Sequence, residues 1–402
     1  MSPTADPMEA AAHTPESRTG PRTPWSYTLR TALLAALAVC IVLLAFTWPS
    51  VTAKIQNLPI AAVGSQELIS QITTNAPAGA LDVLIASSRD EAVDLIEHRQ
   101  VYGAIVVGTS PEILVASAGS PVASQALTQM GAQMQSQMQA RAITKLQAAA
   151  AQSVQAAQAA AKGQAPRNGQ AGPAQQGTQS ATVPQIAVTD VVPLSPDDAR
   201  GTGLAVVGLP LAMGGMIGGV LISLLVSGTW RRLGAILTYG AIAGLALTGI
   251  LQGWFHTLQG SFWANAGAIG LGIVATAAII VGLNALVGKA GISLGAVITL
   301  FIGNPLSSLT QPKEFLPVPW GDVGQWLVPG ASGTLLRDLS YFPDTSIAFP
   351  WLVLTGWAVA GAALTAFGHF RNAPAIADIQ HQESGAPRGI HPSAGAGVEK
   401  HV

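Results

Sequence analysis

Histidine, cysteine and acidic side chains are the usual metal ligands and catalytic groups, and their spacing in this chain matches no motif for either role. The seven histidines are scattered and form no His-Glu-x-x-His pattern. The single cysteine, Cys40, leaves no thiolate pair for a metal site and no disulfide within one chain. The sequence also lacks a Gly-x-x-x-x-Gly-Lys-[Ser/Thr] phosphate loop. We therefore expect no enzyme activity, no bound metal and no cofactor.

Polar residues within or beside long apolar stretches could instead contact a transported substrate. The candidates for such a path are Asn284, Thr299, Asn304 and Trp320. Polar groups at membrane depth are uncommon and often mark a substrate or ion path. Hydrogen bonds between neighbouring helices are the other use of such groups, and the sequence leaves this alternative open.

Charged residues at the ends of the apolar stretches could form a hinge or a gate. The candidates are Asp198, Arg200 and Arg337. Asp197 and its neighbours could form ion pairs with Lys313 or Arg337, and an exposed pair of this kind contributes under about 1 kcal/mol. We interpret these groups as positioning elements.

Residues 333–342 have the spacing of an amphipathic helix. Leu335, Leu336, Leu339 and Phe342 fall on one face, with Arg337 and Asp338 on the other. This pattern predicts a helix that lies on the membrane surface or caps the membrane helices. A substrate gate is the alternative.

The composition indicates a membrane protein. Only 10% of the residues are charged and 49% are hydrophobic, whereas an average soluble protein has about 25% charged residues. The net charge of −1 and the absence of a Lys/Arg-rich run argue against nucleic-acid binding. Six stretches approach or reach the length of apolar helix that a bilayer requires: 31–48, 203–226, 233–254, 263–287, 292–309 and 347–368.

Basic residues near the ends of these stretches set the predicted orientation. Arg22, Arg30, Arg231, Arg232, Lys289 and Arg371 are expected on the cytoplasmic side. Both termini are then cytoplasmic in a multi-pass protein of the bacterial plasma membrane, and residues 49–200 and 310–346 lie outside. The predicted divisions are a disordered N-terminal tail 1–29, a first span 30–48, an outer domain 49–200, a five-helix domain 201–370 and a disordered C-terminal tail 371–402.

The predicted outer domain has an α/β pattern. Apolar strands are expected at 58–63, 81–85, 101–107, 113–115 and 186–192, with helices after Ser65 and Ser88. In the second helix, Glu91, Asp94, Glu97 and Arg99 are predicted to be solvated. Residues 122–162, rich in Ala and Gln, predict a long helix, and residues 163–182 predict a flexible linker. The predicted fold class is therefore an α-helical polytopic membrane protein of six transmembrane helices, with an extracytoplasmic α/β domain carrying a long helix.

The membrane stretches contain glycine faces but no acids. Gly214, Gly215, Gly218, Gly219, Gly240 and Gly244 form small-xxx-small faces, which predict close helix packing within one chain or across a homodimer. No Asp or Glu occurs in 201–303 or 347–368. Proton coupling through intramembrane carboxylates is therefore not expected, which argues against a resistance-nodulation or lipid-exporting carrier.

Several short stretches and the order of the spans resemble two membrane families. The stretches are 58–63 (LPIAAV), 101–107 (VYGAIVV) with 114–119 (LVASAG), 190–194 (DVVPL) with 198–201 (DARG), and 304–307 (NPLS) with 315–317 (FLP), 320–321 (WG) and 327–331 (LVPGA). Together they resemble type-2 ABC exporter permeases and the related phage-infection-protein (Pip-like) family. The resemblance covers most of residues 25–370.

The resemblance implies an envelope protein that helps to export a hydrophobic or amphipathic substrate, as a dimer with a separate ATPase subunit. In the exporters the ATPase docks on a cytoplasmic coupling helix, but the inner links 228–232 and 288–291 are too short to form one. The Pip-like family therefore fits better. The alternative function is a non-transporting scaffold or surface receptor that binds a phage, a secretion component or another envelope protein.

Overall fold

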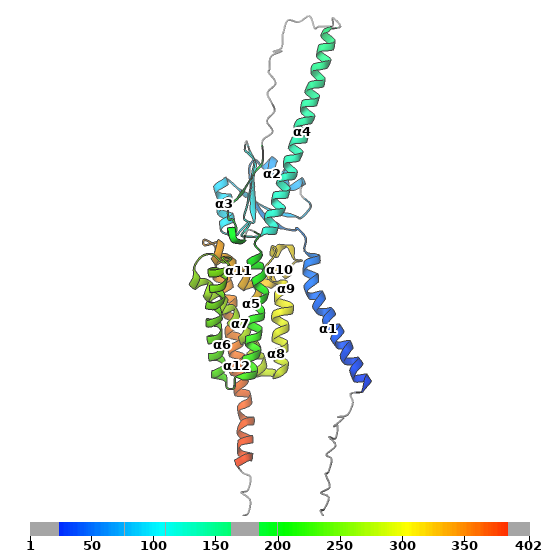
Figure 1. Cartoon of the computed structure of the whole chain (residues 1–402). Helices are drawn as coiled ribbons and strands as arrows, with labels where there is room; N and C mark the ends of the chain where they lie inside the picture. Colours follow the sequence, from blue (N-terminus) through cyan, green and yellow to red (C-terminus); the bar gives the residue numbers. More distant parts are fainter. Residues whose placement is uncertain (1–23, 76, 109, 162–184, 199, 385–402) are drawn as a thin grey trace, which may run out of the picture. The chain divides into compact units, whose positions relative to one another are not determined.

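The computed structural model of the chain describes residues 24–75, 77–108, 110–161, 185–198 and 200–384 (Figure 1). The predicted linker 163–182, most of the predicted N-terminal tail and residues 385–402 lie outside these ranges. The chain forms two compact units, Met1–Thr47 and Trp48–Val402. The first helix, α1 (Trp25–Thr52), begins in the first unit and ends in the second.

Within the described ranges, six helices are long and apolar enough to cross a membrane. They are α1, α5 (Thr202–Leu225), α6 (Thr229–Thr248) with the π-helical turn η2 (Gly249–Trp254), α7 (Phe262–Val287), α8 (Lys289–Ala296) with η3 (Val297–Gly303) and α9 (Asn304–Leu306), and α12 (Ala348–Ser384). This confirms the predicted helical fold with six helices of membrane-spanning length and composition. The fifth apolar helix begins at Lys289 and ends at Leu306, so it is shifted from the predicted 292–309.

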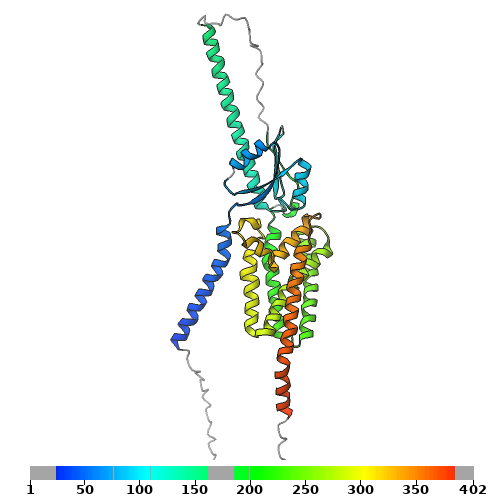
Figure 2. The ribbon, with the colours of Figure 1, turned by 180° about the vertical axis from the view of Figure 1, so that it is seen from behind.

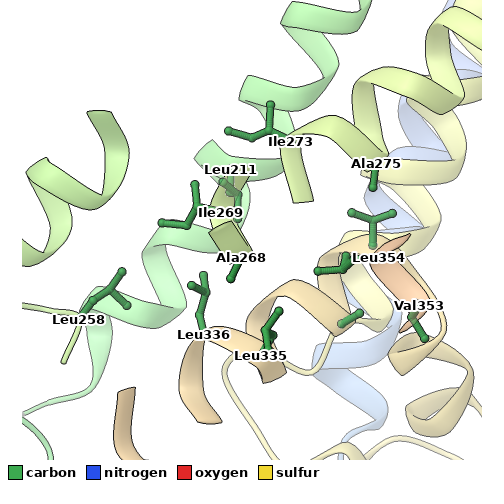
Figure 3. Packing of buried hydrophobic residues seen from close by; sticks show 12 residues of the cluster. Leu211, Leu258, Ala268, Ile269, Ile273, Ala275, Leu335, Leu336, Val353 and Leu354 are labelled. Carbon is green, nitrogen blue, oxygen red and sulfur yellow. The ribbon is translucent and has the colours of Figure 1, made fainter. Parts of the chain in front are cut away.

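The second unit contains a helix bundle built around α7. Of the apolar window in α7, 83% is buried, whereas the values for the other bundle helices are 22% to 39%. Figure 3 shows this apolar core, in which Ile269 and Ile273 of α7 lie beside Leu211 of α5 and Ala275 of α7 lies beside Leu354 of α12. The helix is central because its sequence is apolar on every side, which suits a helix surrounded by others.

Glycines bring the bundle helices close to α7. A Cβ atom on Gly244 would lie 2.5 Å from the carbonyl oxygen of Ala266, and one on Gly215 would lie 2.7 Å from Cβ of Thr276. On α12, a Cβ atom on Gly361 would lie 2.3 Å from the backbone of Ala278. The predicted glycine faces are therefore used within one chain, at Gly215, Gly218, Gly219, Gly240 and Gly244. Gly214 has more space, and its carbonyl accepts a 2.7 Å hydrogen bond from Tyr239.

In the sheet domain (residues 57–198), the described residues form five strands, which correspond to those predicted. They are β1 (Leu58–Val63), β2 (Leu81–Ala86), β3 (Gly103–Val106), β4 (Glu112–Val115) and β5 (Ala187–Asp190), in the order β2-β1-β3-β4-β5. Only the β3–β4 pair is antiparallel. Helices α2 (Gln66–Asn75) and α3 (Arg89–Glu97) connect the first three strands, as parallel neighbours require.

The long helix α4 (Pro121–Ala161) begins on the sheet and extends beyond it (Figures 1 and 2). Its first turns bury Ala123 and Leu127, and Met130 and Met134 pack against the same cluster. From residue 139 nearly every position is exposed, including Ile143, with 55% of its surface accessible. Only the first part of α4 is therefore held by the sheet.

A connecting segment (residues 307–347) joins α9 to α12. It contains η4 (Lys313–Phe315), α10 (Trp320–Gln325) and α11 (Val328–Tyr341). Leu335 and Leu336 of α11 are buried in the bundle core. This helix therefore caps the bundle, which is one of the two positions predicted for it, the other being the membrane surface. At the other end of the bundle, α12 continues to Ser384. Residues 371–384 of the predicted C-terminal tail are therefore part of this helix.

Candidate functional site

Two phenylalanines of the connecting segment complete the core of the sheet domain. Side chains alternate between the faces of a sheet, and the two faces here form separate clusters. Phe342, which directly follows α11, is buried on the face covered by α3. Phe315 of η4 is buried on the face covered by α4. The connecting segment is thus part of the sheet domain as well as the cap of the bundle.

Hydrogen bonds hold the same junction. The Lys54 amide donates to the Phe315 carbonyl at 3.2 Å, and Gln56 Nε2 donates to the Leu316 carbonyl at 2.9 Å. Close to Phe342, Thr345 Oγ1 donates to the carbonyl of Glu97 at 3.2 Å. These bonds hold the connecting segment against the residues that precede β1 and against the end of α3.

Between these contacts lies a polar cavity of about 490 Å³. The sheet domain contributes the end of α3 and the start of β3, and the connecting segment contributes most of the remaining lining. The residues that define its chemistry are Arg99, Tyr102, Ser308, Glu314, Arg337 and Asp338. A volume of this size is in the range of small-ligand sites, which span about 300–1,000 Å³.

The most buried charges of the cavity are an ion pair between the two domains. Arg99 Nη1 donates to Asp338 Oδ1, and the exposed fractions of the two side chains are 17% and 3%. The guanidinium of Arg99 also lies 5.4 Å from the ring centre of Phe342, within cation–π distance. Burial raises the pKa of the Asp338 carboxyl, and the nearby Arg99 charge opposes that rise. This pair connects the turn that follows α3 of the sheet domain to α11.

Arg337 is a second cation beside this pair. Its Nη2 donates to the carbonyl of Leu309 at 2.8 Å, and among the residues that the structure describes it forms no ion pair. Burial, and then the neighbouring Arg99 charge, lowers the pKa of Arg337 to about 10. Two guanidinium groups therefore lie close together, and only that of Arg99 is paired with the Asp338 carboxylate.

The remaining charges of the cavity have their own partners. Tyr102 Oη donates to Glu314 Oε2 at 3.1 Å, and burial followed by the Glu314 charge raises the pKa of the tyrosine. Lys313 Nζ donates to Asp322 Oδ1 at 2.7 Å, and the exposed fractions of these side chains are 43% and 70%. The Lys313–Asp322 pair is therefore solvated, in contrast to the Arg99–Asp338 pair.

Ser308 is the one residue of the cavity wall with a buried, unpartnered hydroxyl. Its φ of +53° lies in the left-handed region, which a serine rarely adopts. The residue is 9% exposed, and its Oγ has no hydrogen-bond partner among the described residues. Its neighbour Gln325 is held in place by Thr334 Oγ1, which donates to Gln325 Oε1 at 2.6 Å.

Aromatic residues line one edge of the cavity. Trp326 and Phe349 are in edge-to-face contact, with ring centres 5.0 Å apart, and 62% of Trp326 is exposed. The carbonyl of Trp326 accepts a 2.8 Å hydrogen bond from Trp357 Nε1 of α12. The aromatic edge thus lies next to the start of an apolar helix.

A separate apolar groove of about 420 Å³ lies between α5 and α6. Its lining includes Val207 and Leu211 of α5, Leu247 of α6, and Leu251 and Phe255 at the η2 turn. It has almost no polar surface. A groove of this kind suits acyl or other hydrocarbon chains.

The four predicted substrate-path residues lie in different places. Asn284 is near the end of α7, at the turn into α8, whereas Asn304 is at the opposite end of that hairpin. Thr299 is buried and lines a void of about 10 Å³. Trp320 begins α10 and contacts Trp48 edge to face, with ring centres 6.2 Å apart. Neither the polar cavity nor the apolar groove has any of the four in its lining.

Of the predicted hinge or gate residues, the structure places only Arg337 in the polar cavity. Asp198 is buried and accepts a 2.9 Å hydrogen bond from the Gly203 amide at the start of α5, and Arg200 is exposed. Lys313 pairs with Asp322, so the predicted pairing of Lys313 with the acids near α5 is not the one the structure forms.

The prediction that Arg99 is solvated is wrong, because its side chain is only 17% exposed. Asp338, predicted on the polar face of the amphipathic helix, is 3% exposed, because this face packs against the sheet domain. Sequence spacing identifies the apolar face of α11 but does not show that a distant domain covers its polar face. The φ of +55° at Arg99, directly after α3, turns the chain at this point, and no local sequence pattern predicts that turn. No family model matches the chain, and neither the curated proteins nor the solved structures include a detectable relative.

Proposed function

We propose that this protein is a permease-like membrane protein that takes part in export of a hydrophobic or amphipathic substrate, together with a separate ATPase subunit. The observation that carries the proposal is the polar cavity at the end of the helix bundle, bordered by the aromatic pair Trp326 and Phe349. A site with a charged interior and an aromatic edge suits a molecule with a polar head and an apolar tail. The resemblance to type-2 exporter permeases and to the Pip-like family supports the same function.

The apolar groove between α5 and α6 adds to this argument. Its lining is almost entirely hydrocarbon, and it is next to the lipid if the six helices span a bilayer. An amphipathic substrate requires both an apolar surface and a polar site. The chain offers one of each at the end of the bundle that carries the connecting segment.

The proposed orientation places the sheet domain outside the cell. It follows from the basic residues of the inner links, such as Arg231 and Arg232, which favour the cytoplasmic side. The native chain has one cysteine, so a Cys40→Ser background permits single-cysteine labelling. A membrane-impermeant maleimide applied to intact cells should label cysteine at Ser87 in the sheet domain but not at Ser227 in the inner link. Labelling only at Ser227 would reverse the proposed topology.

The proposed function requires an energy source. The test is purification of the tagged, full-length protein from its native membrane in mild detergent, followed by mass spectrometry and an ATPase assay. A stoichiometric nucleotide-binding subunit with ATP turnover is the expected result. Recovery of envelope or secretion proteins without ATPase activity would contradict the permease.

The alternative is a non-transporting scaffold or receptor. The observation that favours it is the exposed half of α4, which carries accessible apolar residues such as Ile143, Leu146 and Val154. Removal of residues 139–183 is a direct test. It should leave the ATPase partner bound if the protein is a permease, and it should abolish co-purification of the envelope partner if α4 is the docking surface.

A further inference from the structure

We propose that the polar cavity binds the anionic head group of an amphiphile, a phosphate or carboxylate, and that Arg337 is its principal ligand. This inference rests on the proposed function and names the class of substrate. The occupant we commit to is a lipid-like molecule, with its head group at Arg337 and its chain directed past Trp326 and Phe349.

The first argument is the distribution of charge. Over the whole cavity, three basic side chains of Arg or Lys face three acidic ones, but they are not evenly placed. Lys313 and Asp322 neutralise each other at an exposed position. In the inner part, Asp338 is paired with Arg99 and Glu314 is hydrogen-bonded to Tyr102, so Arg337 is a buried cation without an ion-pair partner among the described residues. A buried cation without its own counter-ion is costly, and a bound anion would remove that cost.

The second argument is the set of available donors. A guanidinium has five N–H donors, and the one described hydrogen bond of Arg337 uses a single donor. The hydroxyl of Ser308 is buried in the same cavity wall without a partner, and it is held there by a left-handed backbone conformation. Guanidinium and hydroxyl donors together match the oxygens of a phosphate or carboxylate.

The third argument distinguishes an amphiphile from a free anion. The volume of about 490 Å³ is far larger than a phosphate ion needs. Exposed Trp326 and Phe349 form one edge of the cavity, where α12 begins its apolar course. Aromatic rings at such a boundary are typical of residues that contact the interfacial region of a bilayer. The edge therefore offers a path for an acyl chain while the head group stays in the polar interior.

The experiment uses the full-length protein in nanodiscs of phosphatidylcholine. Dihexanoyl phosphatidic acid, dihexanoyl phosphatidylcholine and inorganic phosphate are each titrated, with tryptophan fluorescence and the shift in Tm as readouts. Phosphatidic acid should bind saturably, and phosphatidylcholine should bind at least about 10-fold more weakly. Replacing Arg337 by Gln should weaken the binding of phosphatidic acid by about 10- to 100-fold, which is the loss of affinity expected for charge-assisted hydrogen bonds.

Matched variants separate binding from folding. Arg231→Gln removes an exposed arginine of the inner link and should leave binding unchanged. Arg337→Lys retains the positive charge and should recover part of the affinity lost in Arg337→Gln. Ser308→Ala removes only the hydroxyl and should weaken binding by a smaller factor. If Arg337→Gln does not yield folded protein, as judged by size-exclusion elution and Tm, Arg337→Lys and Ser308→Ala carry the test.

Three outcomes would overturn the proposal. They are equal affinity for phosphatidic acid and phosphatidylcholine, unchanged phosphatidic acid binding in the Arg337 and Ser308 variants, and Arg337-dependent binding of inorganic phosphate as tight as that of the lipid. The last outcome would assign the site to a free anion. Arg337-dependent lipid binding without an ATPase partner would retain the site and refute the exporter. An active ATPase complex whose lipid binding does not depend on Arg337 would support the exporter and refute the site.

Discussion

The helix bundle differs in packing and polarity from the joining layer, which consists of the connecting segment (residues 307–347) and the polar cavity that it forms with the sheet domain. Around α7 the packing is apolar and close, with glycine backbones in contact and local voids of only about 20 and 10 Å³. In the joining layer, charged side chains surround a cavity of about 490 Å³. Both layers are formed by segments distant in sequence, and both contain buried hydroxyls without a partner among the described residues, Ser223 and Thr248 in the bundle and Ser308 in the joining layer. In the joining layer the unpartnered hydroxyl lies beside buried charges and a large cavity.

This difference assigns different tasks to the two layers. Close-packed apolar helices resist small displacements, because every lost contact costs dispersion and cavity energy. A polar layer with a cavity can exchange its internal partners for a ligand. We therefore expect ligand binding and movement to be concentrated in the joining layer. The effects of mutations there should differ from the effects of mutations in the bundle.

The largest loss of folding stability is expected from Asp338→Ala. It leaves Arg99 without its ion-pair partner, close to the second buried guanidinium of Arg337, and removing one partner of a buried pair costs about 3–5 kcal/mol. The control is Asp322→Ala, whose exposed pair with Lys313 contributes under about 1 kcal/mol. Chemical unfolding in detergent measures both. Equal losses would show that the joining layer is as solvated as the protein surface.

The next effect is expected from Phe342→Ala. The ring is 1% exposed and completes one face of the sheet domain, and loss of a buried phenylalanine costs about 3–5 kcal/mol. We expect about 3 kcal/mol, because water from the adjacent polar cavity can enter the space. Limited proteolysis should then cut the sheet domain faster, whereas Phe367→Ala, at a 62% exposed position, should not alter the rate. An unchanged rate in Phe342→Ala would refute the role of this ring.

A moderate effect is expected from Gly361→Val in the bundle. The new side chain would meet the backbone of Ala278, which cannot move aside, and overpacking of this kind costs about 1–3 kcal/mol. Gly356→Val on the same helix has no neighbour within 4 Å and controls for helix propensity. The difference in Tm between the two variants isolates the packing term. If Gly361→Val is no less stable than Gly356→Val, the α7–α12 contact is looser than described.

The smallest effect concerns an ion pair far from the cavity. Arg89 holds the pKa of Glu112 below its ordinary value of 4.5, chiefly by a hydrogen bond that is 2.8 Å long. A carboxyl with a lowered pKa contributes stability above 4.5 and loses it as the pH falls through the folded-state pKa. Wild type should therefore exceed Arg89→Gln in Tm by a small margin near neutral pH. That margin should shrink as the pH falls below 4.5 and the carboxyl becomes protonated, and a margin that persists in strong acid would assign it to packing rather than charge.

The elements of the fold were largely predictable, whereas the site was not. Apolar length and periodicity predict the six helices and the five strands, because these patterns are local. The cavity depends on Arg99, Tyr102 and Asp338, which are far apart in the sequence and meet only in the folded unit. Sequence spacing places Arg337 and Asp338 on the polar face of a helix, a position that is usually exposed to solvent. Only the packing of a second domain on that face makes them buried ligands and ion-pair partners.

The dependence of the sheet domain on Phe315 and Phe342 has a consequence for biosynthesis. The last strand of the sheet domain ends at Asp190, so about 150 further residues must be synthesised before the chain includes Phe342. At about 5–20 residues per second, this delay is roughly 8–30 s. During that interval both faces of the sheet lack an aromatic side chain that completes them. Assembly of this domain must therefore finish late, after four of the apolar helices that separate its two parts have been synthesised, and it requires protection of the open faces until then.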